Sequence, residues 1–182
     1  GDKYGIISED DNYNEILALI KFAINNNDVA VIIKSQFNRN TPKLLYRNDS
    51  YMKNVVKTNR FLDLHKGQTR NICFPSEAAM AADIVIGHVV GATAGLEAAL
   101  TGKRCVLLNP YNMLGENIEL FKKGDVLYED IGKALNACKE YHKGNVKYQG
   151  LGDWSPFIDL FDPFRDGKSA YRLRSTLENI MD

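Results

Sequence analysis

The chain has 182 residues, a length that suits one domain better than two. Its hydrophobic fraction of 45% and charged fraction of 25% are typical of a soluble globular domain, and 23 Lys and Arg residues balance 23 Asp and Glu residues. This balance argues against a nucleic-acid-binding protein, and no apolar run approaches the roughly 20 residues that span a bilayer.

The three cysteines, Cys73, Cys105 and Cys138, form no CxxC motif and no Cys/His cluster. Cys73 and Cys105 lie in apolar, strand-like runs, where thiols usually act as small hydrophobic side chains. This usage predicts a reducing cytoplasm and no structural metal. The chain begins with Gly and shows no signal peptide, so we expect a piece of a longer protein.

The first 33 residues predict a strand, a helix and a second strand. Residues 4–8 are a short apolar run, and the acidic Ser8-Glu-Asp-Asp segment offers a helix start. Apolar residues then recur at spacings of three and four from Tyr13 to Ile24, which predicts an amphipathic helix closed by Asn25-Asn-Asn-Asp. Residues 29–33 are an apolar, β-branched run, as expected for a strand buried on both faces.

The rest of the chain continues the alternation after a polar stretch, 38–59, with one predicted helix at 50–58. Strands are predicted at 61–64, 71–74, 83–87, 104–108 and 126–128, and helices at 76–82, 93–101, 117–122, 131–141 and 168–181. Strands alternating with helices of this size form βαβ units. We therefore predict a Rossmann-like α/β domain, a parallel sheet with helices on both faces.

Four aromatic residues precede or begin the C-terminal segment: Trp154, Phe157, Phe161 and Phe164. We expect them to pack the core of the last helix, and the alternative is a surface that faces a missing domain or a membrane. The charged residues that follow form either a solvated turn or an interdomain latch; they are Arg165, Asp166 and Lys168.

In an open parallel sheet, ligands bind beyond the carboxyl ends of the strands. Four segments follow predicted strands and should share this rim: 34–36, 74–77, 87–93 and 109–112. The third is the most informative, because Gly91, Ala92 and Thr93 carry little side chain and directly precede a helix. A phosphate can approach such a backbone and meet the free N–H groups and dipole of the helix start. The alternative is that small residues only allow tight helix–strand packing.

Three side chains in or near this loop have more than one interpretation each. The Thr93 hydroxyl either donates to a phosphate or caps the helix. Glu97, one turn into the helix, either accepts hydrogen bonds from a ribose or faces solvent. His88, directly after the strand, either contacts a phosphate or sugar carboxylate or is structural, and it could also be a general acid or base.

Other candidates lie on the remaining segments of the rim. Lys34 ends a predicted buried strand and either contacts a phosphate or donor sugar or extends to solvent. Phe74 and Ser76, on either side of Pro75, either contact a base or form a plain turn in which Ser76 is the N-cap. The polar residues after the last core strand either contact a ligand or form a turn, and the sequence favours neither role; they are Asn109, Tyr111 and Asn112.

Residues 83–108 resemble the nucleotide-binding signature of GT-B glycosyltransferases: a strand, a small-residue loop, Leu-Glu-Ala-x-x-x-Gly-Lys and another strand. The resemblance implies that Gly91, Ala92 and Thr93 hold the nucleotide phosphate and that Glu97 binds the ribose. The whole chain fits the C-terminal half of such an enzyme in order and length. Residues 162–173 also resemble the C-terminal segment of bacterial surface-polysaccharide transferases.

The resemblance implies a capsular or surface-polysaccharide glycosyltransferase in the cytoplasm, at the inner membrane face if it associates peripherally. Residues 1–182 would be one nucleotide-sugar-binding domain, with 153–182 as a helical extension. A nucleotide sugar would be the donor and a saccharide or glycolipid the acceptor, with no cofactor and no metal. The acceptor and the catalytic base would belong to an absent N-terminal domain. The alternatives are a UDP-GlcNAc 2-epimerase relative and a non-catalytic nucleotide-binding or assembly module.

Overall fold

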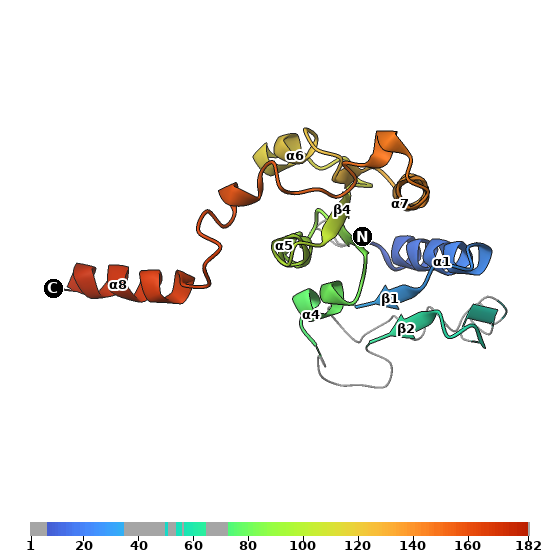
Figure 1. Ribbon diagram of the computed structural model, residues 1–182, viewed down its shortest axis with the longest axis horizontal. Coiled ribbons are helices and arrows are strands. Elements are labelled where there is room, and N and C mark those ends of the chain that lie inside the picture. The colour runs from blue at the N-terminus through green and yellow to red at the C-terminus, as the bar shows by residue number, and fades with distance from the viewer. Residues whose placement is uncertain (1–6, 35–49, 51–53, 56, 65–72, 182) are drawn as a thin grey trace.

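The computed structural model of the chain describes residues 7–34, 50, 54–55, 57–64 and 73–181. Helices and strands alternate along the described chain (Figure 1). In order they are α1 (Glu9–Asn25), β1 (Val31–Ile33), β2 (Phe61–Asp63), α4 (Pro75–Met80), β3 (Ile84–His88), α5 (Thr93–Leu100), β4 (Arg104–Leu108), α6 (Glu116–Phe121), β5 (Leu127–Tyr128), α7 (Ile131–His142), the 3-10 helices η1 (Val146–Tyr148) and η2 (Ile158–Leu160), and α8 (Ser169–Met181).

The strands form two parallel sheets. β1 pairs with β2, with Val31 opposite Phe61. The second sheet has the order β3-β4-β5, and its register places Ile84 opposite Arg104 and Leu107 opposite Leu127. Among the described residues, no strand of one sheet pairs with a strand of the other. The predicted α/β class with parallel strands is confirmed, but the described strands form two sheets where a single sheet was predicted.

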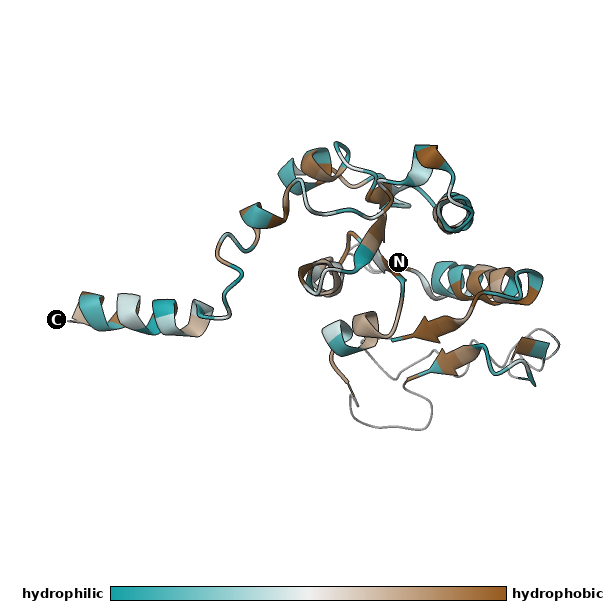
Figure 2. Cartoon of the chain, viewed as in Figure 1, coloured by the Kyte–Doolittle hydropathy of each residue, from teal (hydrophilic) through white to brown (hydrophobic). Residues whose placement is uncertain are grey.

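Helices cover both faces of the three-stranded sheet. Side chains alternate along β4, so successive residues pack against different helices. Cys105 and Leu107 join a buried cluster with α4, α5, α6 and the segment around Trp154. Val106 and Leu108 join another with α7 and Leu151. Figure 1 shows α4 and α5 on one side of the strands and α1 and α7 on the other. Hydrophobic residues dominate β1, β2 and β4, whereas α1 and α8 mix both kinds (Figure 2).

The strands differ in burial. Every residue of β4 after Arg104 is buried, as predicted for a core strand. In β1 only Val31 is buried, so the prediction that this strand is buried on both faces is wrong. β3 is half-buried throughout. In the described part of the chain β4 has a strand on each side, whereas β1 and β3 are each paired on one side only.

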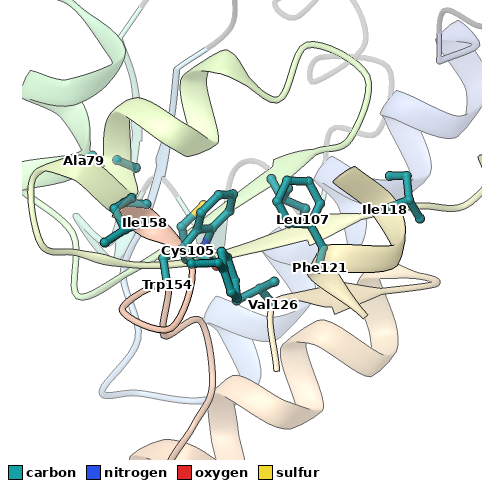
Figure 3. Packing of buried hydrophobic residues seen from close by; sticks show 11 residues of the cluster. Ala79, Cys105, Leu107, Ile118, Phe121, Val126, Trp154 and Ile158 are labelled. Atoms are coloured by element: carbon teal, nitrogen blue, oxygen red, sulfur yellow. Dashed lines mark hydrogen bonds between the residues drawn. The ribbon is translucent and has the colours of Figure 1, made fainter. Parts of the chain in front are cut away.

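An aromatic cluster of Phe121, Trp154, Phe157 and Phe161 packs the segment after α7 against β4 (Figure 3). Trp154 is only 4% exposed, and its indole N–H donates to the backbone carbonyl of Cys105 at 2.8 Å. Its ring centroid lies 5.1 Å from that of Phe121 and 5.3 Å from that of Phe157. Just before it, Gly152 has a φ of +61°, and a Cβ there would lie 2.8 Å from the nitrogen of Cys105. This close approach requires glycine.

Trp154 and Phe157 therefore pack a core, together with the partly buried Phe161. The prediction that the four aromatic residues pack the core of the last helix is wrong. None of the residues of α8 is buried, and Figure 1 shows this helix extending away from the body of the protein. Phe164 is exposed and lies under the Arg172 guanidinium, 4.0 Å from the ring centroid. Arg172 also binds Asp166, at 2.9 and 3.0 Å to its two carboxylate oxygens.

Two predicted strands differ from the structure at helix starts. Of residues 4–8, the first three lie outside the described part; Ser8 is the N-cap of α1, where its hydroxyl accepts the N–H of Asp11 at 3.1 Å. Of residues 71–74, the first two also lie outside it, and Cys73 and Phe74 are not in a strand. In both cases a residue that the apolar pattern assigned to the end of a strand is instead the N-cap of a helix. Of the described residues of the predicted 50–58 helix, 50, 54–55 and 57 are helical and 58 is in a turn.

The cysteines are free thiols. Burial raises the pKa of Cys105 to about 12 and that of Cys138 to about 11. Because the thiolate is the reactive form, both act as small core side chains.

Candidate functional site

The small-residue loop, defined here as residues 91–93, joins β3 to α5. Gly91 has a φ of +74°, is exposed, and has open space where a Cβ would stand. Thr93 is also exposed. The backbone of this loop can therefore be approached closely from solvent, and glycine at position 91 allows its left-handed conformation.

The start of α5 lacks a side-chain cap. Ala92 is the N-cap and makes no side-chain hydrogen bond, and Thr93 is the first helical residue, so the predicted capping role of Thr93 is wrong. Orphan N–H groups at a helix start favour an anion when no side chain satisfies them. By contrast, a Cβ at Gly95 would lie 2.7 Å from Leu107 Cδ2, so tight helix–strand packing explains Gly95 rather than Gly91.

Glu97 lies in the middle of α5 and is half-buried. Within the described part of the chain, its carboxylate makes no hydrogen bond or ion pair. It is therefore available to accept hydrogen bonds from a ligand, and the solvent-facing interpretation also stays open.

His88 is the last residue of β3 and has a carboxylate partner that the sequence did not suggest. Its Nε2 lies 2.9 Å from Glu15 Oε2 of α1, and the two side chains are 22% and 16% exposed. Its Nδ1 is buried and has no hydrogen-bond partner in the described part of the chain. Such an orphan polar atom costs about 1–3 kcal/mol and calls for an explanation.

A second contact brings the same helix to the end of β4. The hydroxyl of Tyr111 donates to Asp11 of α1 at 2.6 Å. Hydrogen bonds from Ser8 and Tyr111 lower the pKa of Asp11, and the bond to Asp11 raises the pKa of Tyr111. Asp11 and Glu15 are one helical turn apart, so the first two turns of α1 belong to the rim. From the sequence, the acidic segment Ser8-Glu-Asp-Asp indicated only a helix start. Because it follows a predicted strand, it could also have been placed at the ligand-binding edge of the sheet.

The loops after β3 and β4 are neighbours, because His88 pairs with Leu108 and the Val89 N–H donates to the Leu108 carbonyl at 3.0 Å. Asn109 is buried, and its side chain bonds the backbone N–H of Met113 at 2.8 Å and its carbonyl at 3.1 Å. Turn chemistry therefore explains Asn109. Asn112 has a φ of +48°, a conformation that Asn adopts readily.

The remaining candidates are spread over other elements. Lys34 directly follows β1 and is half-buried. Phe74 is the N-cap of α4 and is 72% exposed, and its N–H donates to Glu77 Oε2 at 2.6 Å. Ser76 is the second residue of this helix, so its predicted N-cap role is wrong. Pro75 takes the first position, which suits its fixed φ.

A cavity of about 270 Å³ opens at the opposite end of β4, between the end of α5 and the C-terminal segment. Its charged lining is Lys103, Arg104, Asp153 and Arg165, and none of the predicted site residues borders it. Arg165 pairs there with Asp159 at 2.5 Å.

No group of three or more His, Cys, Asp or Glu residues that could hold a metal ion occurs in the described ranges. In the same part of the chain, no helix is both long and apolar enough to cross a membrane. Comparisons with family models, curated proteins and solved structures found no match to this chain.

Proposed function

We propose that this chain is the nucleotide-sugar-binding domain of a GT-B-type glycosyltransferase that builds a surface polysaccharide or glycolipid. One observation carries the proposal: the exposed small-residue loop, with Gly91 at positive φ, leads from a parallel strand into the uncapped start of α5. Ligand phosphates bind at this point of open α/β sheets, where backbone N–H groups and the helix dipole meet them.

The neighbouring side chains suit the other parts of a nucleotide sugar. Glu97 follows the loop by one turn and offers a carboxylate to ribose hydroxyls. The exposed ring of Phe74 offers a stacking surface for a base, and Ser76 and Lys34 are proposed as further polar contacts. In the transfer reaction, the helix-start N–H groups and the Thr93 hydroxyl would stabilise the leaving phosphate. The base that deprotonates the acceptor would belong to a further domain.

A nucleotide panel tests this proposal directly. Thermal unfolding of the chain is measured with UDP, CMP, GDP and ADP, each added in large excess. A ligand at about 100 times its Kd adds roughly 2.7 kcal/mol to stability, so we expect a clear rise in Tm with at least one base. A Tm that none of the four nucleotides changes would contradict nucleotide binding. Conversion of UDP-GlcNAc without any acceptor would instead favour an epimerase.

Glu97→Gln is expected to weaken binding of the preferred nucleotide by about 1–3 kcal/mol, or roughly 5- to 150-fold. Glutamine keeps the shape but loses the charge that strengthens hydrogen bonds from the ribose. The 2′-deoxynucleotide should bind the original protein more weakly, yet lose much less on the Glu97→Gln change. Calorimetry of the four combinations measures this coupling.

The matched control is Glu119→Gln on α6, whose exposed carboxylate pairs with Lys122 at 2.6 Å, and it should leave binding unchanged. Equal binding of ribo- and deoxyribonucleotide to the original protein, or strictly additive losses, would remove Glu97 from the ribose site.

A further inference from the structure

The Glu15–His88 pair joins two separately packed parts of the protein. Glu15 belongs to α1, which buries Ile16 and Ile20 in a cluster with β1. His88 ends β3, in the other sheet. The pair is mostly buried, unlike the His142–Asp28 pair, in which Nε2 and Oδ2 lie 2.8 Å apart and the side chains are 69% and 57% exposed.

The position of His88 relates this pair to the proposed phosphate site. His88 is followed after two residues by Gly91, the first residue of the small-residue loop. Asp11 on the same helix and Tyr111 after β4 lie near the pair: Tyr111 donates to Asp11, and the charge of Glu15 helps to raise the pKa of Tyr111. Two carboxylates therefore lie on the α1 side of the site, and a protonated His88 would offset part of their charge.

We propose that Glu15 is a positioning residue for His88: it accepts the Nε2 proton and holds the imidazole beside the loop, so that phosphate binding is coupled to protonation of His88. The inference rests on the proposed function, since it assigns a role to the proposed phosphate site.

The chemistry gives this coupling a definite sign. With His88 neutral, the pair carries the single negative charge of Glu15 and repels a phosphate. A proton added at Nδ1 makes the pair neutral and turns the buried, unpartnered nitrogen into a donor. A phosphate nearby favours that form, and by linkage the proton favours the phosphate. Affinity is therefore expected to fall as pH rises and His88 loses its proton.

The test uses the full chain with UDP-glucose, GDP-mannose and ADP-glucose, whose phosphodiester charges do not change near neutral pH. Dissociation constants are measured from about pH 6 to about pH 8.5, the range in which histidines titrate. In parallel, NMR follows the His88 ring signals with and without ligand. We expect binding to weaken with rising pH, and bound ligand to keep His88 protonated to higher pH.

Glu15→Gln keeps the shape of the side chain but removes its charge. It should move the His88 titration to lower pH and move the pH dependence of binding with it. Asp28→Asn is the matched control, because it breaks a second His–carboxylate pair, His142–Asp28, which lies away from the loop. It should change the titration of His142 and leave the pH dependence of binding unchanged.

The outcomes separate this inference from the proposed function. Binding that does not vary with pH, or a Glu15→Gln variant that loses affinity equally at every pH, would overturn the inference and leave nucleotide binding standing. Tighter binding by Glu15→Gln with an unchanged pH profile would show that Glu15 only repels phosphate. If no nucleotide sugar binds the original protein at any pH, the proposed function fails and the inference fails with it.

Discussion

Trp154→Ala is expected to lower the free energy of unfolding by about 3–5 kcal/mol, the usual cost of deleting a buried aromatic side chain. Trp154 packs against Phe121 and Phe157, and its indole N–H satisfies the carbonyl of Cys105. Both contributions disappear in the variant. Urea denaturation followed by circular dichroism measures the loss, since the variant removes the chain's one tryptophan.

Two further variants separate packing from hydrogen bonding. Trp154→Phe keeps most of the apolar surface and removes the donor, so a loss of about 1–3 kcal/mol is expected. Phe164→Ala removes an exposed ring, whose contact with Arg172 is worth no more than about 1 kcal/mol. If Trp154→Ala cost no more than Phe164→Ala, the aromatic cluster would not stabilise this core.

Gly91→Val is expected to weaken nucleotide binding more than about 100-fold, a loss of roughly 2.7 kcal/mol or more. A β-branched residue does not tolerate the φ of +74° at this position, and its side chain would occupy the open space above the loop. The effect on binding is measured by calorimetry with the nucleotide that raises Tm most.

Gly102→Val is the matched control for this variant. Gly102 follows α5 as Gly91 precedes it, has a φ of +80°, and also has open space where a Cβ would stand. Both variants bear a comparable backbone penalty, of order 1–3 kcal/mol, but only Gly91→Val changes the proposed phosphate site. Equal losses of affinity in the two would mean that backbone strain, not the loop, limits binding.

The periodic part of the fold was predictable from the sequence. The spacing of apolar residues identifies α1, and the predicted limits of β4 coincide with the observed Arg104–Leu108. The predictions failed where two signals overlap within a few residues. Ser8 and Phe74 end apolar runs, but each caps a helix, and capping depends on local hydrogen bonds rather than periodicity.

The candidate site was predictable only in part, for a different reason. The small-residue loop is contiguous in sequence, so spacing alone reveals it. The Glu15–His88 pair joins residues far apart in the chain, and its formation depends on how α1 packs against the end of β3. Likewise, nothing local indicates that Trp154 packs against β4 rather than against the helix that follows it.

Residues 152–158 pack against β4 but are synthesised after it, so this contact forms late. Chains emerge from the ribosome N-terminus first, and β3, α5, β4 and α6 are complete well before Trp154, Phe157 and Ile158 appear. Until then the apolar face around Cys105 and Leu107 lacks part of its cover. A nascent chain therefore presents an aggregation-prone surface through this interval, and chaperones that bind exposed apolar segments would act on it then.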